Sequence, residues 1–123
     1  MAYLRQPIIL LAVTSALSII KHTKDTKYHA YVIHQVNKNN QSILPSAILA
    51  LGAVGNKDDM KILVEIAKRK DGKFLFHCTN SMLRIDYDAA MLMLDELKKY
   101  FGPYSRQARL IDSVSENFDA GAT

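Results

Sequence analysis

His77 and Cys78 are the residues of this chain whose types could together support nucleophilic chemistry. They are adjacent in the sequence, and a thiol beside an imidazole is the pairing that activates a cysteine nucleophile. On a helix, however, neighbouring side chains point about 100° apart, so the two cannot hydrogen-bond as nucleophile and base. Cys78 also falls in the apolar register of Leu75 and Met82, which predicts a buried, inert thiol.

The other titratable residues do not form a pattern typical of a metal or cofactor site. His29 and His34 are five positions apart, whereas a spacing of four would place both imidazoles on one helix face. The glycines are scattered singly, unlike those of a phosphate-binding loop. Paired carboxylates stand near expected helix starts, where capping and the helix dipole explain them: Asp58 with Asp59, Asp86 with Asp88, and Asp95 with Glu96. We therefore expect no catalytic residue, no metal and no cofactor.

Helical periodicity runs along the whole chain, and turn residues divide it into segments. No useful length alternates with period two, which indicates an all-α protein. Pro7 is suited to the first position of a helix, Gly55 to a helix end, and Gly102 with Pro103 to a break. The expected helices are 7–21, 27–37, 46–54, 58–70, 73–85, 88–101 and 104–118, with Asp25 or Thr26 capping the second and Asp88 capping the sixth.

A shift of the sequence by 31 positions places apolar residues on apolar residues. Ala47, Leu51 and Leu63 then fall on Cys78, Met82 and Leu94. The opposite shift relates Ala16, Ile20 and Val32 to Ala47, Leu51 and Leu63. A period in this range is typical of helical-repeat solenoids. We expect one domain over residues 1–123, a right-handed superhelical stack of about seven antiparallel helices, with 119–123 as a flexible tail.

The run ILALGAVGNKDD at 48–59 resembles the HEAT and armadillo-like repeat family, in particular its short bacterial form. In that family an Ala-x-x-Ala-Leu-Gly helix precedes a polar joint and a leucine-containing helix. The resemblance spans residues 7–118 and is strong over 46–97, although the next unit, at 80–88, lacks the glycine. It implies a HEAT-like α-solenoid with an extended binding surface. A plain helical bundle is the alternative.

Charge placement is the feature that carries most information about a partner. The chain has a net charge of +4 and a pI near 9.2, which mildly favours an acidic partner. In a stack of helix pairs, alternate joints fall on opposite edges. On one, called the balanced edge, five lysines stand against five aspartates: Lys21, Lys24, Lys27, Lys57 and Lys61 against Asp25, Asp58, Asp59, Asp86 and Asp88. The other set of joints carries nine cations against one carboxylate, Asp71, and two tyrosines there are candidate interface anchors. We call this surface the basic edge. Its predicted partner-binding residues are Lys38, Lys68, Arg69, Lys70, Lys73, Lys98, Lys99, Tyr100, Tyr104, Arg106 and Arg109. Cations at helix ends are also favoured by about 0.3–1 kcal/mol without any partner.

The N-terminal segment has some features of a secretory signal, with Arg5 ahead of an apolar run. That run, 7–20, contains a threonine and two serines and is shorter than the roughly 20 residues that span a bilayer. Because Ala16 and Ile20 also fit the repeat register, a buried first helix is the favoured interpretation. The single cysteine excludes an internal disulfide and fits a reducing compartment, so we expect a cytoplasmic protein without a membrane span.

These features favour a non-enzymatic module that binds another protein with an acidic surface. The resemblance implies, as the most concrete role, a bacterial immunity protein that blocks a cognate toxin. Larger HEAT-like proteins bind nucleic acid through a basic face, which makes a nucleic-acid binder the first alternative. The second alternative is an enzyme of the bilin-lyase type, which contains related repeats.

Overall fold

A computed structural model describes residues 2–118, with side chains from Pro7 onward, and these residues are helical without any strand. The all-α prediction is confirmed. Short 3₁₀ turns at Thr26–Tyr28, Lys57–Asp59 and Arg69–Asp71 precede or follow the helices. The tail expected at 119–123 lies outside the described residues. The helices are α1 (Ala2–Thr23), α2 (His29–Asn37), α3 (Leu44–Val54), α4 (Met60–Lys68), α5 (Leu75–Ile85), α6 (Tyr87–Phe101) and α7 (Arg106–Glu116).

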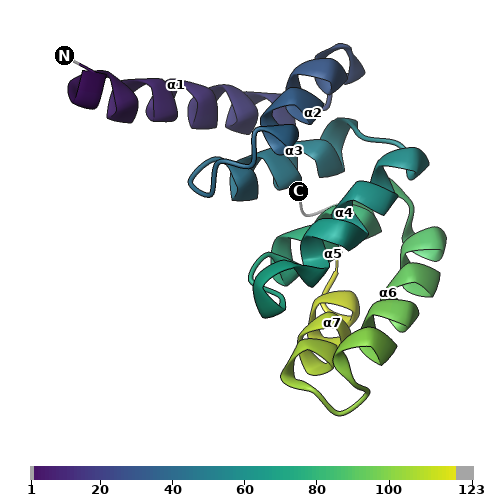
Figure 1. Ribbon diagram of the computed structural model, residues 1–123. Coiled ribbons are helices and arrows are strands. Elements are labelled where there is room, and N and C mark those ends of the chain that lie inside the picture. The colour runs from purple at the N-terminus through teal and green to yellow at the C-terminus, as the bar shows by residue number, and fades with distance from the viewer. Residues whose placement is uncertain (1, 119–123) are drawn as a thin grey trace.

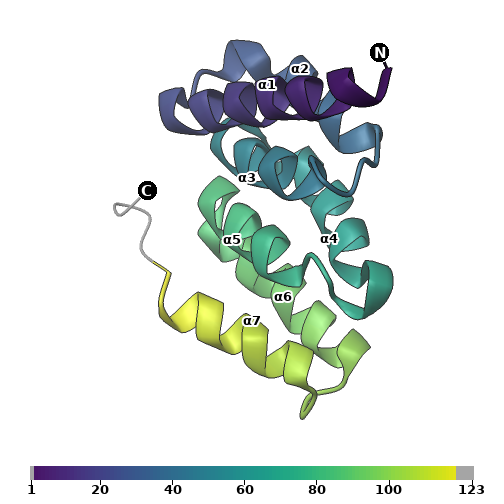
Figure 2. The same cartoon turned by 90° about the vertical axis from the view of Figure 1, so that its left-hand side faces the viewer.

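The odd-numbered helices form a continuous row, in which α1 packs on α3, α3 on α5, and α5 on α7. The even-numbered helices lie against this row: α2 on α3, α4 on α5, and α6 on both α5 and α7. α4 also contacts α6. Figure 2 shows α1 and α7 at opposite ends of the molecule, with α3 and α5 between them. The arrangement therefore places α4 and α6 side by side on one flank, as Figure 1 also shows.

The core includes the positions that the 31-residue shift related to one another. Ala47, Leu51, Leu63, Cys78 and Met82 are fully buried, and they belong to three different helices. Their partners in the shift behave similarly, since Leu94, Val32 and Ile20 are also buried and Ala16 is half-buried. The register read from the sequence thus identified part of the set of side chains that hold the helices together.

A very close approach between helices joins α3 to α5 at Gly52. The hydroxyl of Ser81 donates a hydrogen bond to the carbonyl oxygen of Ile48, at 2.7 Å. A Cβ atom at Gly52 would lie only 2.9 Å from the Cα of Ser81, which is closer than packed carbon atoms approach. Glycine is therefore required at this point for the packing of the two helices.

Helix starts and ends differ from the predicted ones at several places. The prediction that Pro7 opens the first helix is wrong, because α1 begins at Ala2 and contains Pro7. Asp88 does not cap α6; Asp86 does, because its Oδ1 accepts a hydrogen bond from the backbone N–H of Ala89, at 3.0 Å. The cap of α6 is displaced by two residues, within the range by which sequence patterns misplace helix ends, whereas the start of α1 lies five residues before the predicted one.

Two further ends are decided by the backbone at single residues. Asp25 caps the turn before α2 as predicted, by accepting a hydrogen bond from the N–H of Lys27. α4 stops at Lys68 rather than Lys70 because Lys70 adopts a left-handed conformation, with φ 49°, and Gly72 follows with φ 87°. Left-handed residues end a helix and turn the chain toward α5.

The expectation of a buried first helix is met only along one side of α1. Leu17 and Ile20 are buried against α3, but Ile8, Leu11 and Ile19 are each more than 60 % exposed. The reason is that α1 lies at one end of the row, with packing on one face only. Within the described part of the chain, none of the helices combines the length and the apolar character needed to cross a membrane.

The loss of stability as the pH falls should depend in part on Asp86. The N–H of Ala89 and then the ammonium of Lys57, 3.0 Å away, hold the pKa of the Asp86 carboxyl below its usual range. A lowered folded-state pKa adds stability that is present above the unfolded-state pKa and is lost as pH falls through the folded-state pKa. Asp86→Asn keeps a capping oxygen but cannot titrate. We expect Tm to fall less steeply with acidification in the variant than in the wild type; parallel curves would contradict this.

Candidate functional site

The joints after α2, α4 and α6 meet along one edge of the molecule, as the basic-edge hypothesis requires. Hydrogen bonds connect successive joints: Arg69 Nη1 to Asn39 Oδ1 at 3.3 Å, Lys70 Nζ to Gln41 Oε1 at 3.1 Å, and Gln107 Nε2 to the carbonyl oxygen of Asp71 at 3.1 Å. The paired residues are 30, 29 and 36 positions apart. The first two separations are close to the 31-residue period of the sequence, and the third is five residues longer.

The opposite edge has paired charges, in agreement with the balanced count from the sequence. His29 Nε2 lies 2.7 Å from Asp59 Oδ2, connecting the joint before α2 to the joint before α4. Lys57 Nζ lies 3.0 Å from Asp86 Oδ2, connecting the latter joint to the start of α6. Polar side chains on this edge thus fasten neighbouring joints to each other.

Cations of the basic edge have more carboxylate neighbours than the sequence count included. Glu65 Oε1 lies 3.4 Å from Arg69 Nη2, and Glu96 Oε1 lies 3.3 Å from Lys99 Nζ. Each glutamate is about one helical turn before its cation in the chain. Lys98 contacts both Asp95 and Asp112. Counting charges at joints overlooked these carboxylates because they belong to the helices beside the joints. The basic edge is therefore less positive than the sequence predicted.

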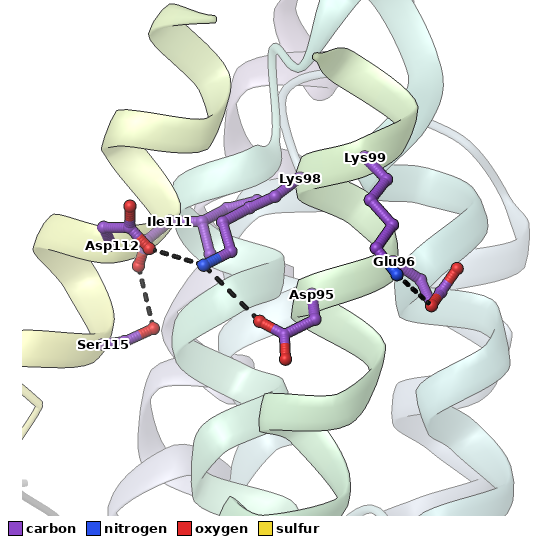
Figure 3. A network of polar contacts seen from close by, with 7 residues as sticks. All are labelled: Asp95, Glu96, Lys98, Lys99, Ile111, Asp112 and Ser115. Carbon is purple, nitrogen blue, oxygen red and sulfur yellow. Dashed lines mark hydrogen bonds and ion pairs between the residues drawn. The ribbon is translucent and has the colours of Figure 1, made fainter. Parts of the chain in front are cut away.

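Lys98 and Lys99 are neighbours in the sequence but point to different sides of α6 (Figure 3). Lys98 Nζ lies 2.8 Å from Asp112 Oδ1 on α7, and this hydrogen bond raises the lysine pKa. The side chain thus fastens α7 to α6. Lys99 extends instead to the side occupied by Glu96. Only Lys99 of this pair is placed to meet a partner beside α4.

The other members of the basic edge are spread along the joints. Tyr104 is 90 % exposed, and its carbonyl oxygen accepts a hydrogen bond from Arg109 Nη1. Lys73 Nζ lies 5.5 Å from the centre of the Phe74 ring. Lys38, Lys70 and Arg106 are also exposed. These side chains form a loose row of cations on the surface.

A groove between α4 and α6 brings three of the predicted residues together. It has a volume of about 610 Å³ and is called the α4–α6 groove below. Lys68, Lys99 and Tyr100 were predicted from the sequence, whereas the rest of the lining was not. The complete lining is Lys61, Val64, Lys68, Met93, Glu96, Leu97, Lys99 and Tyr100.

The groove combines an apolar floor with a mainly cationic rim. Val64 and Met93 are half-buried and contribute apolar surface, and Leu97 is almost fully buried. Lys68 Nζ lies 4.7 Å from the centre of the Tyr100 ring, a cation–π distance that places the ammonium over the aromatic wall. Among the described residues, Lys61 and Lys68 have no carboxylate within ion-pair distance. Both charges are therefore free to pair with a partner.

Sequence reasoning missed Lys61, Val64 and Met93 because it sorted residues by joints and not by outer helix faces. A usable signal was present, since Lys61, Val64 and Lys68 follow the i, i+3, i+7 spacing of one helix face. Met93 and Leu97 are four residues apart and therefore also lie on one face of α6. What the sequence does not state is that these two faces adjoin.

The residues that suggested nucleophilic chemistry lie away from this groove. Cys78 is fully buried, as predicted, and loss of hydration raises the pKa of its thiol to about 12. Desolvation lowers the pKa of His77, whose Nδ1 is buried without a hydrogen-bond partner among the described residues. Over the described part of the chain, no three His, Cys, Asp or Glu side chains are grouped so as to hold a metal ion.

The burial of Cys78 predicts slow thiol chemistry in the folded protein. A buried thiol with a raised pKa has almost no thiolate at neutral pH, and thiolate is the reactive form. We expect a thiol-specific reagent such as dithionitrobenzoate to modify Cys78 only as fast as the protein opens. In denaturant the reaction should be complete within mixing time. Rapid stoichiometric labelling of the folded protein would show that Cys78 is accessible.

Comparison of the chain with models of known families, with characterised proteins and with solved structures gives no match. What the protein does must therefore be inferred from its own residues and their geometry.

Proposed function

We propose that this protein is a non-enzymatic binding module that engages an acidic protein partner through the α4–α6 groove. The observation that carries the proposal is the apolar floor bordered by Lys61 and Lys68, whose charges have no carboxylate partner among the described residues. An acidic partner would add ion pairs at the rim, where the apolar contacts exclude water and strengthen them. Nucleic acids lack the apolar side chains that this floor would bury.

The architecture within this proposal is a right-handed, antiparallel HEAT-like solenoid. Its support is the row in which α1, α3, α5 and α7 contact one another in turn, together with the edge contacts between residues about one period apart. Solenoids of this kind bind partners through extended surfaces and not through closed pockets. The most concrete role is a cytoplasmic immunity protein that occupies and blocks a toxin.

The proposal is tested by charge reversal in the groove. The partner is first captured by a photo-crosslinking residue at position 100 in the native host and is then purified for calorimetry. We expect Lys61→Glu with Lys68→Glu to weaken its binding by about tenfold or more, because two attractions become repulsions. Tm should fall by a few degrees at most, since both side chains are exposed and the loss of the Lys68–Tyr100 contact costs about 0.5–1 kcal/mol.

The matched control is Lys38→Glu with Lys73→Glu, which changes the net charge equally but lies on the basic edge. If the control weakens binding as much as the groove variant does, long-range charge and not the groove governs binding. If a toxin is encoded beside this gene, its toxicity should be relieved by co-expression of the wild type but not of the groove variant. Equal protection by both would contradict the proposed site.

Nucleic-acid binding is the second candidate, and the exposed cations Lys38, Lys73 and Arg106 along one edge favour it. Such binding would involve phosphate contacts and would weaken steeply with salt. A gel shift at low ionic strength tests it. The absence of a shift with single- or double-stranded DNA or RNA would remove this candidate, whereas a shift that is lost in the Lys38 and Lys73 control variant would support it.

A further inference from the structure

The walls of the α4–α6 groove specify what kind of protein segment fits it. We infer that the groove binds an amphipathic α-helix carrying two carboxylates seven residues apart, with an apolar stripe between them. This inference rests on the proposed function and defines the partner segment of that same site. It follows from the spacing of the groove residues, from the shape of the groove and from the position of the one carboxylate in its lining.

The α4 wall sets the spacing of the carboxylates. Lys61 and Lys68 are seven residues apart on one face of a continuous helix, with Val64 between them. At 1.5 Å of rise per residue, their positions are separated by about 10 Å along the helix axis. Two residues seven apart on a partner helix have the same separation, so two carboxylates can meet both ammonium groups at once. Because the two lysines carry the same charge, either direction of the partner helix satisfies the pattern.

The shape of the groove favours a helix over an extended strand. α4 and α6 lie side by side, and the outer faces of two adjacent helices form a trough into which side chains of a third helix fit. Met93, Leu97 and Tyr100 follow helical spacing along the α6 wall. An added strand would instead need the free edge of a sheet, and the described residues contain no strand. Apolar side chains one turn apart on a partner helix would meet Val64 and Met93.

Glu96 is the one carboxylate in the groove lining, and it moderates binding of an acidic helix. Its Oε1 lies 3.3 Å from Lys99 Nζ, so it neutralises the third lysine of the rim (Figure 3). Both side chains are largely exposed, which makes the pair easy to break. Glu96→Gln would release Lys99 and remove a repulsion. If Glu96 serves only the fold, Glu96→Gln should not tighten binding of the acidic helix.

The inference is tested with synthetic peptides and the full chain by fluorescence anisotropy. The probe is a helix-forming peptide with glutamates at i and i+7 and leucines at i+3 and i+4. We expect this peptide to bind the wild-type protein. The variant Lys61→Glu with Lys68→Glu should bind the peptide roughly tenfold or more weakly, and Glu96→Gln should bind it severalfold more tightly. The Lys38→Glu and Lys73→Glu control should change its affinity about twofold or less. A peptide with lysines in place of both glutamates should not bind.

A second peptide with proline at its centre keeps the charge but cannot form the helix. We expect its affinity to fall by about tenfold or more. Equal binding of the two peptides would overturn the helical occupant while leaving the groove as a protein-binding site. The inference also fails if no peptide binds, or if only a long-chain carboxylate such as oleate binds. If the natural partner also ignores the groove variants, the proposed function fails as well.

Discussion

Replacement of Gly52 by alanine is expected to lower the free energy of unfolding by about 2 kcal/mol, although alanine is the better helix former. Helix propensity alone would raise stability by up to about 1 kcal/mol. The added Cβ, however, would lie 2.7 Å from Ser81 Oγ and 2.9 Å from Ser81 Cα. Because the second of these atoms is backbone, a side-chain rotation cannot relieve the overlap. α3 and α5 must move apart, and the packing between them is weakened.

Urea unfolding of Gly52→Ala, Ser81→Gly and the double variant measures this contact directly. Ser81→Gly removes the Cβ and the hydroxyl that meet the new methyl group, so the double variant should be less destabilised than the sum of the two single variants. Simple additivity would show that the side chain of Ser81 does not contribute to the overlap. An increase in stability for Gly52→Ala would show that α3 and α5 lie further apart than in the structure.

Asp59→Ala should lower the free energy of unfolding by about 3 kcal/mol, a large effect for the exchange of a polar residue. Asp59 is only 6 % exposed, and its Oδ2 accepts hydrogen bonds from the N–H of Asn56, at 2.9 Å, and from His29, at 2.7 Å. The first closes the capping box before α4, and the second connects two joints of the balanced edge. Alanine removes both contacts at once.

Asp58→Ala is the matched control, because Asp58 is the exposed neighbour of Asp59 in the same turn. We expect its effect to stay within about 0.5 kcal/mol, as for most surface exchanges. A double-mutant cycle of Asp59→Ala with His29→Ala separates the connection between joints from the cap. Chemical unfolding at neutral pH gives the free energies. Equal losses for Asp58→Ala and Asp59→Ala would rule out a special role for the buried carboxylate.

The Gly52 and Asp59 variants also separate the scaffold from the proposed binding surface. Gly52 and Asp59 hold helices and joints in place, whereas Lys61 and Lys68 are exposed and have no carboxylate partner among the described residues. Scaffold variants should lower Tm, and bind normally below it. Groove variants should bind weakly while Tm falls by a few degrees at most. A variant with both defects would indicate that the groove depends on the packing of α3 against α5.

The sequence alone determined the helical class, the approximate helices and the buried register. These properties depend on neighbours three and four residues apart, which the chain states directly. Leu51 and Met82 could therefore be related by a shift of the sequence and are both fully buried. Helix ends were less predictable, because Asp86 and Asp88 are both suitable caps and the final choice depends on backbone conformation.

The tertiary structure alone decided which charged side chains form a common surface. Lys98 and Lys99 have nearly the same sequence context, yet Lys98 pairs with Asp112 because α7 lies on its side of α6. Lys61 was assigned by its joint to the balanced edge, but it lines the α4–α6 groove with Lys99. The physical reason is that α5 separates α4 from α6 in the chain, so their contact is long-range. Local periodicity fixes the face on which a residue lies, and packing fixes which faces meet.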